Sequence, residues 1–103
     1  MKDLRIDPAV EAELVEALVR HDRLWRQWGR DLHAEFQAAF DAIRRNPTGF
    51  PPYGRRHRLF VLRKTPYVVF YRDLPSVVWI VAIAHTSRRP GYWTRRRPPT
   101  TFE

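Results

Sequence analysis

The stretch SVVWIVAIAH, residues 76–85, is apolar over almost its whole length and rich in Val and Ile. These residues favour β-strands, and a continuous apolar run of this length is typical of a strand buried on both faces. In a regular strand, successive side chains point to opposite faces. One face would then carry Val77, Trp79, Val81 and Ile83, and the other face Val78, Ile80, Ala82 and Ala84. The sequence therefore predicts a central strand that needs cover on two sides.

The segments before this strand are also rich in β-branched and aromatic residues. RHRLFVLRK (56–64) and PYVVFYR (66–72) are joined to each other and to residues 76–85 by very short connections. Such connections are typical of an antiparallel meander. FPPYG (50–54) is predicted to be a loop, and DLRID (3–7) a short additional strand.

Two helices are predicted between residues 7 and 45. Asp7 is a suitable N-cap, Pro8 suits the first helical position, Gly29 is expected to end or bend the first helix, and NPTG (46–49) closes the second. Apolar and aromatic residues recur at helical spacing on both segments: Val10, Leu14, Ala17, Leu18, His21, Trp25 and Trp28, then Leu32, Phe36, Ala39, Phe40 and Ile43.

These elements predict an α+β fold in which an N-terminal helical hairpin packs on one face of a small, mainly antiparallel β-sheet. The hairpin can cover one face of the sheet only. The second apolar face must be covered either by the C-terminal segment folding back or by a partner protein.

Length and composition define the class of protein. A chain of 103 residues is expected to form a single domain over residues 1–103, with residues 94–103 as a flexible basic and proline-rich tail. The chain has no cysteine, no long apolar run and no signal-peptide pattern at its N-terminus. We expect a cytoplasmic protein with no metal, no cofactor and no membrane contact.

The basic residues are concentrated in the second half of the chain. Residues 1–54 hold 8 Lys or Arg against 9 Asp or Glu, a net of −1, whereas residues 55–97 hold 11 against Asp73 alone, a net of +10. Such segregation favours binding to a polyanion or to an acidic protein, although a solvated basic face is the simpler alternative.

Most candidate functional residues lie near the ends of the predicted strands. The candidates for binding a target or partner are Arg58, Arg63, Lys64, Arg72, His85, Arg88, Arg89, Tyr92 and Trp93. Cations can hold phosphate oxygens, and His85 could act as a general base. Structural alternatives are a His85 that is hydrogen-bonded to the backbone and a Trp93 that folds back onto the core.

Four stretches resemble the RelE/ParE superfamily of toxins from bacterial type II toxin–antitoxin systems. DPAVEAELVEA (7–17), RRNPTGFP (44–51), TPYVVFYR (65–72) and AIAHTSRRPGYW (82–93) are similar to ordered motifs of that family. The last is the most specific, and it resembles the ParE branch more closely than the RelE branch. The chain departs from the pattern at Thr65 and Arg89 and in its short first strand.

The resemblance implies a toxin that inhibits growth, takes part in plasmid stabilization, and is neutralised by a cognate antitoxin, with operator DNA contacted only through that antitoxin. ParE-like members act on DNA gyrase without enzymatic chemistry. RelE-like members cut messenger RNA on the ribosome, and for that activity the candidate catalytic residues are His85, Arg88, Tyr92, Arg63 and Lys64.

Matching Tyr92 to the late tyrosine of RelE-like toxins places Thr86 where an arginine is expected, which favours the gyrase hypothesis. The endoribonuclease remains an alternative, and so does a basic binding module without toxicity.

Overall fold

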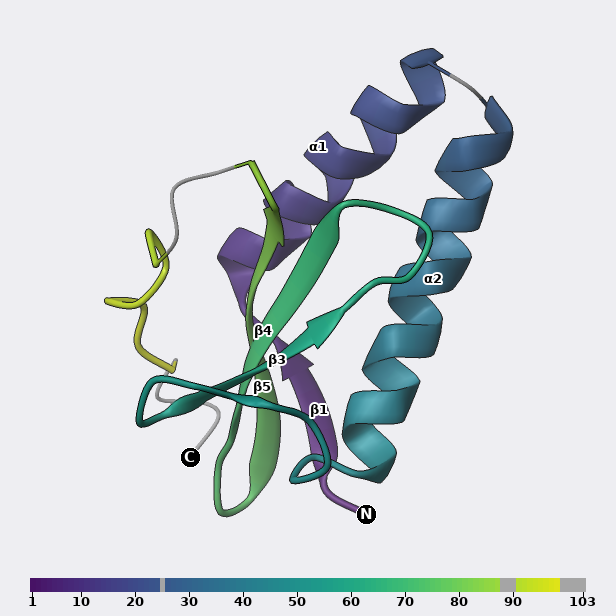
Figure 1. Cartoon of the computed structure of the whole chain (residues 1–103). Coiled ribbons are helices and arrows are strands. Elements are labelled where there is room, and N and C mark those ends of the chain that lie inside the picture. The colour runs from purple at the N-terminus through teal and green to yellow at the C-terminus, as the bar shows by residue number, and fades with distance from the viewer. Residues whose placement is uncertain (25, 88–90, 99–103) are drawn as a thin grey trace.

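The computed structural model describes residues 1–24, 26–87 and 91–98 (Figure 1). Its elements are β1 (Asp3–Ile6), α1 (Pro8–Leu24), α2 (Arg26–Arg45), β2 (Pro52–Tyr53), β3 (His57–Val61), β4 (Tyr67–Asp73) and β5 (Val77–His85). Within the described residues the strands form one sheet in the order β1-β5-β4-β3-β2. β1 runs parallel to β5 and the other pairs are antiparallel. The predicted α+β fold with a mainly antiparallel sheet is confirmed.

Asp7 begins α1 and joins it to the central strand. Its Oδ1 accepts the N–H of Ala9 at 2.9 Å, as an N-cap does, and its Oδ2 accepts the indole N–H of Trp79 at 3.2 Å. Its own N–H donates to the carbonyl of Ile80 at 3.0 Å. The helix start is therefore held against β5 by side-chain and backbone bonds together.

Two sequence predictions on element boundaries are wrong. Gly29 lies inside α2 rather than between the helices, because one glycine costs a helix only about 1 kcal/mol, which packing of the helix can offset. Residues 52–53 of the predicted loop form the short strand β2, because they pair with Arg58 and His57 of β3. The side chains of His21, Trp25 and Trp28 lie outside those that the structure describes.

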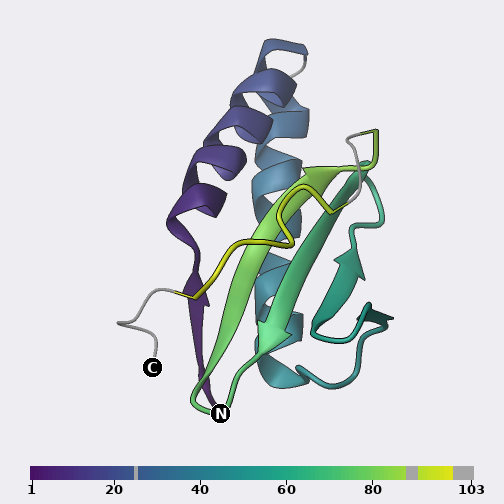
Figure 2. The same ribbon diagram turned by 90° about the vertical axis from the view of Figure 1, so that its left-hand side faces the viewer.

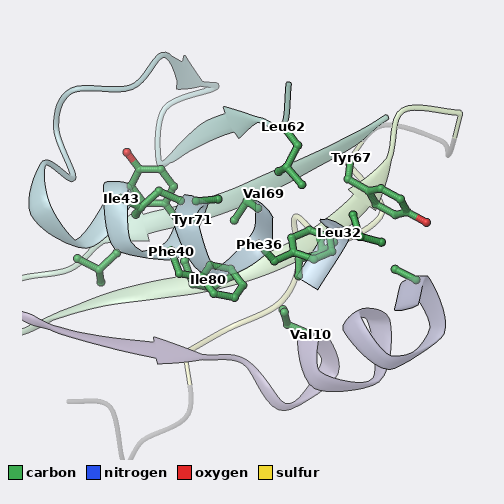
Figure 3. Packing of buried hydrophobic residues seen from close by; sticks show 14 residues of the cluster. Val10, Leu32, Phe36, Phe40, Ile43, Leu62, Tyr67, Val69, Tyr71 and Ile80 are labelled. Carbon is green, nitrogen blue, oxygen red and sulfur yellow. The ribbon is translucent and has the colours of Figure 1, made fainter. Parts of the chain in front are cut away.

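Helices α1 and α2 lie together on one face of the sheet and form the larger core (Figure 3). Its buried members come from both helices, from β4 and β5, and from Leu62, which follows β3: Val10, Ala17, Leu32, Phe36, Ala39, Phe40, Ile43, Leu62, Tyr67, Val69, Tyr71, Val78, Ile80 and Ile83. The periodic apolar residues that the structure describes thus pack in this core, as predicted: Val10 and Ala17 of α1, and Leu32, Phe36, Ala39, Phe40 and Ile43 of α2. Burial raises the pKa of Tyr71 to about 12, and its hydroxyl donates to the carbonyl of Pro47 at 2.5 Å.

A β-bulge in β5 changes which residues face the helices. Phe70 of β4 pairs with Ala82 while the next residue, Tyr71, pairs with Ile80, so Val81 is an extra residue on β5. Val81 and Ala82 consequently both belong to the face away from the helices, with Trp79 and Ala84. The strict alternation predicted for residues 77–84 is therefore wrong beyond Ile80, because the bulge inserts one residue into the pleat.

The second face of the sheet is covered in part by the C-terminal segment. In Figure 2 residues 91–98 cross in front of β5, while α2 lies behind the sheet. Gly91, at φ +79°, opens a turn, and the Trp93 that follows is 1% exposed, with its ring centroid 4.2 Å from that of Phe70. The prediction that Trp93 folds back onto the core is confirmed, and this segment supplies cover for the second apolar face.

Candidate functional site

The edge of β5 beyond β1 is closed by three side chains, which we call the clasp: Glu13, Tyr92 and Arg96. Arg96 Nη1 donates to Glu13 Oε1 and to the carbonyl of Val81, each at 2.8 Å. The hydroxyl of Tyr92 donates to Glu13 Oε2 and, at 3.3 Å, to the carbonyl of Ile83. Glu13 Oε1 also accepts the N–H of Ile83 at 3.4 Å. The clasp joins α1, β5 and the C-terminal segment.

The clasp contains an ion pair, between Arg96 and Glu13, that has little access to solvent. The side chains of Arg96 and Glu13 are 23% and 11% exposed, and the Arg96 guanidinium also lies 5.5 Å from the centre of the Tyr92 ring. Burial alone lowers the pKa of Arg96, but the hydrogen bond and the charge of Glu13 outweigh it and raise that pKa. Tyr92 and Arg96 are therefore parts of the fold as well as members of the basic C-terminal region.

His85 lies at the end of β5 with its ring nitrogen Nδ1 already in use. The backbone N–H of Ser87 donates to Nδ1 at 3.0 Å, and Ser87 Oγ lies 2.6 Å from the same atom. A backbone N–H can only donate, so Nδ1 is an acceptor and the neutral imidazole carries its proton on Nε2. In this arrangement neither nitrogen offers an unused lone pair to a substrate. The structure thus has the backbone-bonded His85 that was the alternative to a general base.

A pocket lies beside His85, between α1 and the ends of β4 and β5. Its lining residues are Glu13, Glu16, Ala17, Arg20, Tyr67, Ile83 and His85. The His85 ring meets the Tyr67 ring edge-on, with centroids 5.2 Å apart, and burial raises the pKa of Tyr67. Arg20 pairs with Glu16 at 3.3 Å. The two acidic residues of this pocket on α1 are thus each matched by an arginine.

The basic candidates do not converge on one point. Arg58 donates to the carbonyl of Phe50 at 2.7 Å, which ties β3 to the loop before β2. Arg72 lies on the second face of the sheet, with its guanidinium 6.0 Å from the centre of the Trp79 ring. Arg63 and Lys64 are exposed at the turn between β3 and β4. Arg88 and Arg89 lie outside the described residues.

Three contributing residues were missed by sequence reasoning. Glu13 is one of several acidic residues on α1, and no local pattern marks it as a partner of residue 96. Glu35 Oε1 accepts the N–H of Lys64 at 3.1 Å and thereby fixes the turn that carries Arg63 and Lys64. The ring of His57 packs edge-on against Trp93, with centroids 4.7 Å apart. Each role depends on a contact between residues distant in sequence.

The described part of the chain has neither a metal-binding cluster nor a membrane-spanning helix. No cluster of three or more histidine or acidic side chains suited to holding a metal ion occurs among residues 1–24, 26–87 and 91–98. Within the same residues, neither helix has the length and apolar character that crossing a bilayer requires.

Comparison with known proteins shows the family of this chain. No curated protein matches it. A family model described as the ParE toxin of the type II toxin-antitoxin system parDE matches residues 4–90, which include both helices, β2 to β5 and all of β1 except Asp3. The chain therefore belongs to the ParE toxin family of type II toxin–antitoxin systems.

Proposed function

We propose that this protein is a toxin that arrests growth by acting on DNA gyrase and that a cognate antitoxin neutralises it. Membership of the ParE family supports the class of toxin. The choice of gyrase over RNA as the target rests on one observation. The side chains that RNA cleavage would need already form hydrogen bonds within the protein. His85 Nδ1 accepts the N–H of Ser87, and the hydroxyl of Tyr92 is bonded to Glu13.

RNA cleavage by a basic protein requires a general base and cations that reach the same phosphate. Here Arg58 and Arg72 contact the Phe50 carbonyl and the Trp79 ring respectively, rather than a shared point. A protein toxin that binds an enzyme needs only a stable surface of suitable shape and charge. The described residues support that second requirement better than the first.

The direct test is a gyrase supercoiling assay with purified toxin on relaxed plasmid. We expect toxin to inhibit supercoiling in a dose-dependent way and its expression to induce DNA-damage signalling. Full supercoiling activity at excess toxin would refute the proposal. Tyr92→Phe is a useful companion variant, because it deletes only a hydroxyl already bonded to Glu13 and is expected to retain growth arrest.

The second candidate is a ribosome-dependent endoribonuclease, which the exposed pair Arg63 and Lys64 favours. Mapping of transcript 5′ ends within minutes of induction separates the two. New ends at codon-spaced positions, lost in Tyr92→Phe, would establish the nuclease in place of gyrase inhibition. Intact transcripts in arrested cells are the result we expect.

A further inference from the structure

The two edges of the sheet differ in how their outward-facing backbone groups are covered. On one side, pairing of β1 with β5 ends at Ile6 and Ile80, so β5 continues past its neighbour. The clasp closes that extension, because its side chains bond the carbonyls of Val81 and Ile83 and the N–H of Ile83. Edge strands attract other strands, and covering side chains are one way in which proteins prevent this.

On the other side, β3 continues past its neighbour without such cover. β2 has two residues, and its pairing ends at Pro52 with Arg58. The N–H of Leu59 donates outward to the carbonyl of Pro51, whereas the N–H of Leu62 donates inward to the carbonyl of Tyr67, both at 3.0 Å. Because outward and inward bonds alternate along an antiparallel strand, the N–H and C=O of Val61 point away from β4.

Val61 is therefore the open position of this edge. No hydrogen bond between described residues reaches its outward N–H or C=O. Val61 is 56% exposed, and few other large apolar residues in the described part of the chain are exposed to this degree. Figure 2 shows β3 at the side of the sheet opposite β1. Val61 thus offers unpaired backbone groups and an exposed apolar side chain, which are the features that an added β-strand binds.

The positive charge around this edge favours an acidic segment as the added strand. Arg63 and Lys64 follow Val61 and are exposed, and the whole chain carries a net charge of +8. Two copies of this chain that paired at β3 would bring these cations together, which opposes self-association. An acidic segment would instead gain both the backbone bonds and the opposite charge.

We propose that an extended, acidic segment of the antitoxin adds to the sheet as a strand beside β3, with its backbone bonded to Val61 and its acidic residues facing Arg63 and Lys64. The proposal rests on the proposed antitoxin partnership and deepens it. The Glu35 carboxylate accepts the N–H of Lys64 and so holds the turn that carries Arg63 and Lys64 in place for this contact.

The test compares Val61→Pro with Val61→Thr in binding to the cognate antitoxin. Proline deletes the outward N–H at a position where the folded chain does not use it, while threonine keeps the N–H and the β-branched shape. We expect Val61→Pro to weaken binding at least about tenfold and Val61→Thr to change it less than about threefold. Equal affinity of all three proteins would overturn the strand site while leaving the partnership intact.

Hydrogen exchange of the wild-type toxin provides a measurement that does not depend on the folding of a variant. The Val61 amide should exchange rapidly in the free toxin and at least about tenfold more slowly in the complex. An unchanged Val61 amide in a formed complex would refute the strand site. Absence of any complex with wild-type toxin would instead refute the partnership itself.

Charge reversal tests the acidic character of the segment. Arg63→Glu should weaken antitoxin binding at least about fivefold at low salt, and the loss should shrink as salt is raised. Arg5→Glu is the matched control, because Arg5 is an exposed cation on β1, at the opposite side of the sheet from β3. Equal losses for both variants would show a general charge effect and contradict the local site.

Discussion

At the scale of single residues, Glu13 of α1 joins the helix to β5 and to the C-terminal segment. It meets Arg96, Tyr92 and the backbone of Ile83 with a side chain that is only 11% exposed. Glu16, one turn away, makes an exposed pair with Arg20. Chemically similar residues three positions apart therefore have very different surroundings.

Glu13→Ala is expected to lower the free energy of unfolding by about 2–4 kcal/mol, because it leaves Arg96 partly buried without its carboxylate. Glu16→Ala, the matched control, should change it by less than about 0.5 kcal/mol, as exposed helix pairs do. Urea denaturation of both variants measures the difference. Similar values for the two would show that the clasp does not stabilise the fold.

His57 is the residue through which pH should act on stability. Burial, followed by the charges of Arg72 and Arg56, lowers its pKa below the ordinary value of 6.5. Its buried Nε2 has no hydrogen-bond partner among the described residues. The folded state thus binds a proton less readily at His57 than the unfolded state does.

A depressed histidine pKa contributes stability that is fully present above pH 6.5 and is lost as pH falls from 6.5 toward the folded pKa. We therefore expect the free energy of unfolding to decrease between pH 7 and pH 5. His57→Gln should remove this component, whereas His85→Gln should retain it. Denaturant titrations across that range provide the measurement, and an unchanged slope in His57→Gln would contradict the assignment.

At the scale of elements, the bulge in β5 and the C-terminal segment act together. The bulge adds Val81 and Ala82 to the face where Trp93 packs. Trp93 contacts Phe70, Tyr53 and His57, which come from three different strands. The indole therefore joins β2, β3 and β4 across the second face of the sheet.

Trp93→Ala is expected to lower the free energy of unfolding by about 3–5 kcal/mol, because it removes a fully buried indole and leaves a cavity. Trp93→Phe keeps an aromatic ring there and should lose less than half as much. Chemical denaturation followed by near-ultraviolet circular dichroism measures both. A loss below about 1 kcal/mol in Trp93→Ala would mean that the C-terminal segment contributes little to the fold.

At the scale of the whole molecule, the charge distribution governs association. The net charge of +8 comes from the second half of the chain, which includes β3, β4 and the C-terminal segment. Part of that charge is engaged inside the fold, since Arg96 and Arg58 bond Glu13 and the Phe50 carbonyl. Exposed cations such as Arg63 and Lys64 remain for long-range attraction of an acidic partner.

Raising NaCl from about 50 mM to about 500 mM should therefore reduce the rate of association with the antitoxin at least about tenfold. The dissociation rate should change much less, because close contacts are screened less than long-range ones. Stopped-flow measurements at several salt concentrations separate the two rates. An association rate independent of salt would contradict electrostatic steering.

The sequence by itself determined the elements and their class. Capping by Asp7 and Pro8, the helical spacing of Leu32, Phe36 and Ile43, and the Val-rich run at 76–85 are local signals, so they specify helices and strands without tertiary information. The predicted flexible tail over residues 94–103 stays a prediction, although Arg96 within it is bonded to Glu13.

Only the tertiary structure decided the position of the bulge at Val81, the clasp of Glu13 with Tyr92 and Arg96, and the engagement of His85 Nδ1. The clasp joins residues about eighty positions apart, and the bulge depends on how β5 matches β4. Sequence periodicity reports which residues are buried, whereas register and partner choice depend on which elements meet in space.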